Sequence, residues 1–270
     1  MTIHELIQEA DRNKDNELIR RSYVNQVVSA LKMQEKVYVM FNAATGYPHV
    51  DPQQNIWMFS TKEFAGHAQD FFAKEELKLH IMEIDHEDFK NFLFYLHLWG
   101  MERIVLDSGH EAYLVLRRDA LLPKSELTDE QKIHLTVVNP DLQRKLLLFF
   151  GTLKNGREYP KKQEYLQSLE DSMLREVIKA IFVAPVKKDT DLFDLYVHEE
   201  DQSEWLPVFT DFSEMSKIYN SEEWDYQWLN YDEVLEASGS RGIAINRKGM
   251  GLWLGQKGKD AIEEFREEEG

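Results

Sequence analysis

The stretch Trp205-Leu-Pro-Val-Phe-Thr-Asp211 decides the fold class of this chain. A short apolar run passes directly into Thr210 and Asp211, which are residue types that begin helices. Such a run predicts a buried strand followed by a helix. A weaker copy of the same pattern, Ile56-Trp-Met-Phe-Ser-Thr61, lies earlier in the sequence. We therefore interpret the two stretches as equivalent strands of two related units.

The elements around the two stretches follow one another in the same order. Each stretch has an apolar strand before it, and a helix, a strand, a capped helix and a tight hairpin after it. In the first half these elements are Val37–Phe41, Leu79–Ile84, the cap at Asp85 and the turn Asp107–Gly109. In the second half they are Ile181–Val183, Trp224–Trp228, the cap at Asn230 and the turn Asn246–Gly249. This recurrence predicts an α/β (α+β) fold with internal duplication, in which two units of mixed sheet are flanked by helices.

The predicted units are residues 1–124 and 125–270. A helical hairpin is expected at the start of the second unit, with a break at Asn155-Gly156 and its second helix beginning at Pro160. A further strand is predicted at Leu192–Val197.

Composition limits the classes of partner. The chain has 270 residues, 49 of them acidic and 32 basic, with a formal charge of −17. Residues 1–124 carry 14 basic against 19 acidic side chains, so most of the excess lies in residues 125–270. A negative field of this size repels nucleic-acid phosphates and anionic lipids, so we expect neither nucleic acid nor membrane as a partner. If a protein partner exists, a basic one is favoured; the alternative is that the charge serves solubility alone.

Several chemistries have no support in the sequence. Cysteine is absent, which excludes disulfides and thiolate chemistry. The glycines from Gly249 to Gly258 do not fit a phosphate loop, because Trp253 and Asp260 occupy positions that need glycine and Ser or Thr. They do not fit the dinucleotide pattern GxGxxG, because the glycine after Gly251 is at 255 and not at 254. His80, Asp85 and His86 are the densest potential metal ligands but match no ligand motif. We predict no catalytic residue, no metal and no cofactor.

The location is predicted from the N-terminus and the hydropathy. Met1–Glu5 lacks a basic region followed by an apolar core, so no signal peptide is expected. Dense apolar runs such as Leu146–Phe150 are much shorter than the ~20 residues of a membrane span. We therefore expect a cytoplasmic protein.

The second unit resembles the N-terminal domain of the bacterial SseB family, the enhanced-serine-sensitivity proteins. The resemblance is carried by four segments: Leu206-Pro-Val-Phe-Thr-Asp211, the helix with Glu214 and Tyr219, Asn230-Tyr-Asp-Glu-Val234, and Gly242-Ile-Ala-Ile-Asn246. It covers about 65 residues. Arg247 stands where the family pattern has proline, and in the first half Met58 and Asp107 replace the valine and asparagine. The resemblance implies a fold and little chemistry, because the family has no agreed catalytic residues.

Two residues of the motif are candidate binding positions. Pro207 fits an edge strand or a strand start, because it cannot donate to a ladder; the alternative is a proline that lines a binding groove. Asn246 suits a tight turn with positive φ; the alternative is an amide that contacts a ligand.

The aromatic residues of the second unit supply the other candidates. Trp224, Tyr226 and Trp228 alternate, so in a strand they share one face, which we predict to be part of the core. The alternative is a recognition surface rimmed by Glu222, Glu223 and Asp225.

These observations favour a non-catalytic bacterial protein that acts through protein–protein interaction or regulation. One alternative is an acidic immunity or inhibitor protein against a basic toxin. The other is an enzyme or small-ligand binder with a pocket between the two units.

Overall fold

A computed structural model describes residues 1–154, 161–190 and 192–269, with the backbone alone for 268 and 269. The predicted break at Asn155-Gly156 and helix start at Pro160 lie outside these residues. The chain divides into two compact units. The first comprises Met1–Leu127 and Phe150–Pro160, and the second comprises Thr128–Phe149 and Lys161–Gly270. The division at 127 falls three residues after the predicted boundary at 124, directly after the short 3-10 turn Lys124–Glu126.

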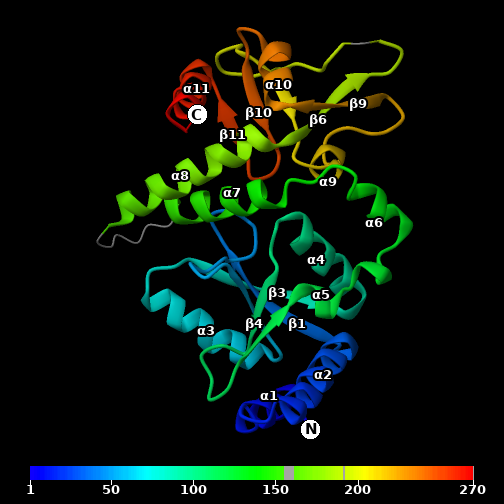
Figure 1. Cartoon of the computed structure of the whole chain (residues 1–270), viewed down its shortest axis with the longest axis vertical. Helices are drawn as coiled ribbons and strands as arrows, with labels where there is room; N and C mark the ends of the chain where they lie inside the picture. The colour runs from blue at the N-terminus through cyan, green and yellow to red at the C-terminus, as the bar shows by residue number, and fades with distance from the viewer. Residues whose placement is uncertain (155–160, 191, 270) are drawn as a thin grey trace. The chain divides into compact units, whose positions relative to one another are not determined.

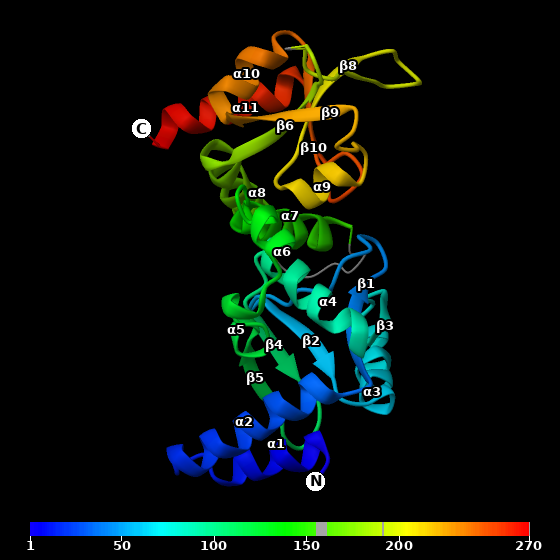
Figure 2. The same cartoon turned by 90° about the vertical axis from the view of Figure 1, so that its right-hand side faces the viewer.

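The elements of the first unit alternate between helix and strand after an N-terminal helix pair. They are α1 (Ile3–Arg12), α2 (Glu17–Met33), β1 (Lys36–Asn42), β2 (Asn55–Phe59), α3 (Lys62–Lys74), β3 (Leu79–Asp85), α4 (His86–Leu98), β4 (Arg103–Leu106), β5 (Leu114–Arg117), α5 (Arg118–Leu121) and the 3-10 turn η1 (Lys124–Glu126). Figures 1 and 2 show α1 and α2 packed side by side near the N-terminus. A capping box begins α1: the Thr2 side chain accepts a hydrogen bond from the Glu5 N–H, and the Glu5 carboxylate accepts one from the Thr2 N–H.

The first unit has a five-stranded mixed sheet in the order β3-β1-β2-β4-β5. Only the β2–β4 pair is parallel. Met40 and Phe59 face α3, where they pack with Phe72, while Phe41 on the alternate face contacts Phe92 of α4. Both faces of β1 are therefore covered, which explains why its sequence is apolar almost throughout.

The second unit begins with helices and continues with strands. Its elements are α6 (Asp129–His134), α7 (Pro140–Leu153), α8 (Lys162–Lys179), β6 (Ile181–Lys187), β7 (Tyr196–Val197), β8 (Glu204–Val208), α9 (Phe212–Ser216), β9 (Trp224–Asn230), α10 (Tyr231–Ser238), β10 (Gly242–Ile245), β11 (Leu252–Leu254) and α11 (Gln256–Glu269). α7 begins at Pro140, whose fixed φ suits the first helical position, and its last residues, from Phe150 onward, belong to the first unit. The strand predicted at Leu192–Val197 is shorter than expected, since only Tyr196 and Val197 pair with β8.

The strands of the second unit form one sheet of order β11-β10-β8-β7 and a separate pair, β6-β9. A bridge between Val183 and Phe209 connects β6 to the end of β8. Val183 and Phe209 are buried there with Met215 of α9 and Tyr219. The predicted core position of Phe209 is thus confirmed.

The strand pairings of the two units correspond. β2 and β8 both pair in parallel with the strand of the following hairpin, and both meet the first strand of their unit in an antiparallel arrangement. β3 and β9 both lie at an edge, antiparallel to that first strand. The predicted mixed α/β architecture is confirmed, whereas the internal duplication stays a prediction.

Candidate functional site

Asn246 closes a buried polar network at the end of β8. Its φ is +50°, as predicted for a tight turn. The Thr210 N–H donates to Asn246 Oδ1 over 3.0 Å, and Asn246 Nδ2 donates to Thr210 Oγ1 over 2.9 Å. Asp107 has the same place in the first unit, with φ +56°, and accepts hydrogen bonds from Ser60 N–H and Oγ. Because Asn246 is fully buried and its amide is engaged, the network supports the fold and offers no surface to a ligand.

The same network extends to the start of α9. Thr210 Oγ1 donates to Asp211 Oδ2, and Asp211 Oδ1 accepts from the Glu214 N–H and caps the helix. Gln143 of α7 donates to Thr210 Oγ1 over 2.6 Å. Burial raises the pKa of the Asp211 carboxyl, and the hydrogen bonds from the Glu214 N–H, Thr210 and Gln143 oppose that rise.

Pro207 is not at a strand start and is buried. It lies inside β8, buried, opposite Ala244 of the parallel strand β10. The other neighbour, β7, pairs only with Glu204 and Trp205, so the missing N–H of Pro207 interrupts no ladder on that side. The predicted edge-strand position is therefore wrong, because β8 is an inner strand. The reason for the prediction still holds, because Pro207 lies where no ladder hydrogen bond from its backbone nitrogen is needed. A role for Pro207 in lining a groove has no support.

The alternating aromatic residues of β9 correct the sequence prediction. Trp224 is partly buried against Tyr219, with ring centroids 5.1 Å apart. Tyr226 and Trp228, predicted to be core, are 47% and 50% exposed. Their rings stack with an interplanar angle of 16°. The error has a structural cause: β9 is an edge strand, and α9 is too short to cover the whole face that β9 presents.

The exposed aromatic pair has a third member that the sequence did not identify. Phe212, the first residue of α9, packs edge-on against Tyr226 at 4.6 Å between centroids. We call Phe212, Tyr226 and Trp228 the β9 aromatic surface. The only sequence signal for Phe212 is its place after the Asp211 cap, and the contact across two elements follows from the fold.

Acidic residues precede the β9 aromatic surface along the chain. The Glu222 and Glu223 side chains are exposed, and both backbone N–H groups donate to Asn220 Oδ1. Asp225 is exposed as well, but strand alternation places it on the face opposite to Tyr226. Within the described part of the chain, none of the three carboxylates has a salt-bridge partner. Glu222 and Glu223 are thus exposed and adjoin β9 in sequence, whereas Asp225 is on its other face; an acidic rim around the aromatic residues stays a prediction.

The corresponding edge strand of the first unit is protected differently. Its exposed Glu83 forms ion pairs with Lys36 at 3.3 Å and Lys62 at 2.6 Å. Paired charges on an edge discourage the addition of another strand. β9 has two large exposed rings and no such ion pair among the described residues.

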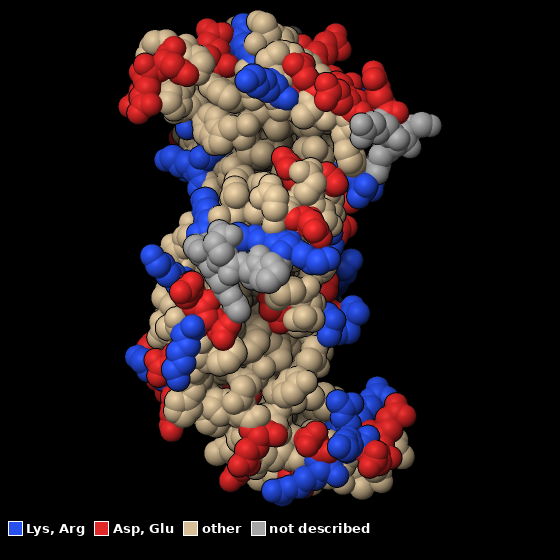
Figure 3. Space-filling model, turned by 90° about the vertical axis from the view of Figure 1, so that its left-hand side faces the viewer, with Lys and Arg blue, Asp and Glu red and all other residues tan. Residues whose placement is uncertain are grey.

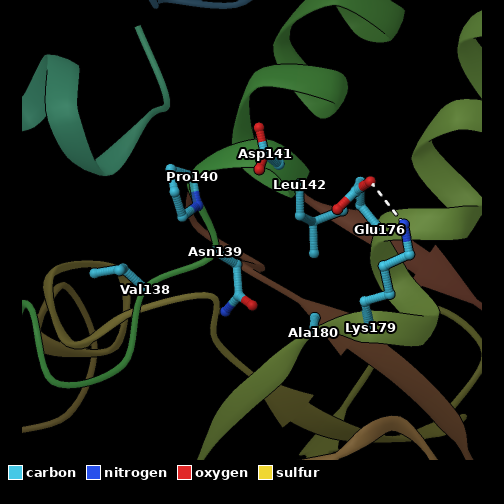
Figure 4. Close-up of a pocket in the computed structure, with 8 residues that line it drawn as sticks. All are labelled: Val138, Asn139, Pro140, Asp141, Leu142, Glu176, Lys179 and Ala180. Carbon is cyan, nitrogen blue, oxygen red and sulfur yellow. Dashed lines mark hydrogen bonds and ion pairs between the residues drawn. The ribbon is translucent and has the colours of Figure 1, made fainter. Parts of the chain in front are cut away.

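A small cavity of about 140 Å³ lies at the start of α7 (Figure 4). Asn139 points into the space between α7 and the end of α8. Its amide nitrogen donates to the Ile181 and Thr210 carbonyls, and its Oδ1 accepts from the Ile181 N–H. Glu176 and Lys179 form an ion pair with each other. Asp141, which also lines the cavity, pairs with Arg144. Each polar side chain of this lining therefore already has a partner within the protein, and the cavity carries no proposal.

Among the residues that the structure describes, no three His, Asp or Glu side chains are placed to hold a metal ion. No helix in the same residues has the length and apolar character that crossing a bilayer requires.

Comparisons with known proteins leave the family open. No protein-family model matches the chain, and neither does any curated protein. A solved structure, Anabaena Tic22 (protein transport), aligns with 78% of this chain and 84% of its own at 9% sequence identity and a TM-score of 0.20. A score this low supports no inference about fold or function.

Proposed function

We propose that this chain is a non-catalytic, SseB-like protein of the bacterial cytoplasm, built from two duplicated units, that binds another protein through the second unit. The occupant we propose is an extended segment of a partner, rich in Lys and Arg, that lies along the β9 edge. The observation that carries the proposal is the exposed, stacked Tyr226–Trp228 pair on an edge strand.

The aromatic rings supply the contact area. Tyr and Trp contribute most strongly to protein interfaces, because each buries a large rigid surface at a small cost in side-chain entropy. The rings of Tyr226 and Trp228 are nearly parallel with centroids 6.4 Å apart, and Phe212 packs against Tyr226 from the side. Tyr226 therefore has protein contacts on two sides before a partner binds.

The edge of β9 provides backbone groups that a partner peptide can pair with. Over the described residues, β9 has a ladder partner on one side, β6. An extended peptide can pair with such an edge through its main chain, and alternate side chains then meet the exposed face. This places every second partner residue against the β9 aromatic surface.

Charge selects a basic partner. Glu222 and Glu223 adjoin the aromatic strand, and the chain as a whole carries −17. On the face that Figure 3 draws, acidic and basic side chains are interspersed. Neutralisation of a basic toxin is a specific form of the same proposal.

The test uses a phage-displayed library of random 12-residue peptides selected on the full chain. We expect selected peptides to be enriched in Lys and Arg. Their affinity should fall about 30-fold or more in the Tyr226→Ser/Trp228→Ser variant, which corresponds to the ~2 kcal/mol of an aromatic hot spot. Tyr113→Ser removes an equally exposed ring from the first unit and is the matched control.

A second variant, with reversed charges, separates the long-range effect of charge on the association rate from the effect of direct contacts on the dissociation rate. Glu222→Lys with Glu223→Lys should lower the association rate more than it raises the dissociation rate, and added salt should reproduce the effect in the unsubstituted chain. Peptides that bind the Tyr226/Trp228 variant as tightly as the parent chain would refute the β9 site. A selection without basic enrichment would refute the proposed partner chemistry.

A further inference from the structure

The first unit has a cavity of about 480 Å³. Most of the charged side chains that line it come from the end of β5 and the start of α5. Its lining residues are His97, Glu102, Arg117, Arg118, Asp119, Pro123 and Lys124. The Arg118 N–H donates to the Glu102 carbonyl over 2.9 Å, which fixes these two positions beside each other. The volume is within the range of small-molecule sites.

Arg118 is a buried cation with incomplete partners. Its side chain is 5% exposed. Nη1 donates to the Leu122 carbonyl over 3.3 Å, and Nη2 is 3.8 Å from Glu102 Oε2, beyond hydrogen-bond distance. Nε is buried without a hydrogen-bond partner among the described residues. Burying a guanidinium is costly unless an anion pairs with it closely, so the site favours an additional negative group.

The remaining charges of the cavity leave it positive. Asp119 is held by Arg117 through two hydrogen bonds of 3.0 and 2.9 Å. Glu102, 42% exposed, is then the one carboxylate left to share between Arg118 and the exposed Lys124. A locally cationic cavity is unexpected in a chain with a net charge of −17.

The pKa of His97 is affected by the same positive charge. Burial lowers its pKa, and the positive charge of Arg118 lowers it further. Its ring lies 3.5 Å from Glu102 through Nδ1. A neutral imidazole keeps one N–H donor, so His97 adds a hydrogen-bonding group at neutral pH without adding charge.

We propose that this cavity binds a small molecule through an oxyanion group, a carboxylate or a phosphate. Arg118 is the buried anchor, since a guanidinium presents a planar fork of donors that matches either group. Lys124 contributes a second cation at the rim. Glu102 occupies the anion position loosely in the free chain, and the ligand displaces it. The volume exceeds that of one oxyanion, so the natural ligand carries an organic part. This proposal is independent of the β9 site, which belongs to the second unit.

The experiment is calorimetric titration of the full chain with inorganic phosphate and with citrate, against chloride at equal ionic strength. We expect at least one of the two oxyanions to bind where chloride does not. Phosphate binding alone assigns a phosphate ligand, and citrate binding alone assigns a carboxylate. Failure of both overturns the proposal.

Three substitutions test the assignment of roles. Lys124→Gln should weaken oxyanion binding about threefold, and Glu102→Gln should tighten it about threefold, as single partly exposed charges do. Arg118→Gln should abolish binding; near-ultraviolet circular dichroism checks that this variant is folded. Lys14→Gln removes an exposed charge of the same unit that does not line the cavity, and should change nothing. Binding that is insensitive to both the Lys124 and Glu102 substitutions would place the anion elsewhere and refute the site.

Discussion

Replacing Asn246 with alanine should destabilise the second unit by about 2–4 kcal/mol. Thr210 is fully buried, and the substitution removes the acceptor of its N–H. An orphaned buried donor costs about 1–3 kcal/mol. Thr210 Oγ1 keeps its bonds with Gln143 and Asp211, so the loss of the Asn246 amide donor adds little.

The backbone contributes separately to this loss. Asn246 has φ +50°, a conformation in which a Cβ costs alanine roughly 1 kcal/mol and glycine nothing. Asn246→Gly removes the same side-chain hydrogen bonds without that strain. Glycine should therefore be more stable than alanine here by about 1 kcal/mol, the reverse of their usual order.

The assay is urea unfolding followed by tryptophan fluorescence. Trp205, Trp224, Trp228 and Trp253 lie in the second unit and report its transition, while Trp57 and Trp99 report the first. The two transitions are fitted separately, because a chain of two units need not unfold in one step. A loss below about 1 kcal/mol, or an alanine variant at least as stable as the glycine variant, would refute the network and the strain argument.

Three further predictions concern packing and pH. Phe209→Ala should cost about 3–5 kcal/mol in the same unfolding assay, since the ring is fully buried; a loss below about 1 kcal/mol would contradict its core position. Gly242→Ala should cost about 1–3 kcal/mol and change the fluorescence of Trp205, because the added Cβ would lie 2.2 Å from that ring; unchanged stability and emission would contradict the close approach. Burial lowers the pKa of His49, which packs against Phe72, to about 4, whereas an unfolded histidine titrates near 6.5. The first unit should therefore lose about 3 kcal/mol as the pH falls from about 6.5 to 4, as measured by urea unfolding at each pH; a His49→Gln variant with the same pH dependence would contradict this.

The local elements were predictable because their signals are local. The capping box at Thr128 and Gln131, the start of α7 at Pro140 and the positive-φ turn at Asn246 depend on residues a few positions apart. An apolar run such as Leu206–Phe209 is expected to be buried in any fold, because exposing its apolar surface to water costs free energy. Sequence alone therefore determined the α/β class, the order of elements and much of the core.

The candidate sites depended on distances that the sequence does not contain. An alternating aromatic strand is buried if both of its faces are covered and exposed if one is open. For Tyr226 and Trp228, the edge position of β9 and the shortness of α9 decided that the rings are exposed. The cavity around Arg118 combines the end of α4, the α4–β4 connection, β5, α5 and η1, whose meeting is set by sheet pairing. Sequence fixes which side chains are able to bind, and tertiary structure decides which of them stay accessible, because burial is a property of what packs above a residue and not of the residue itself.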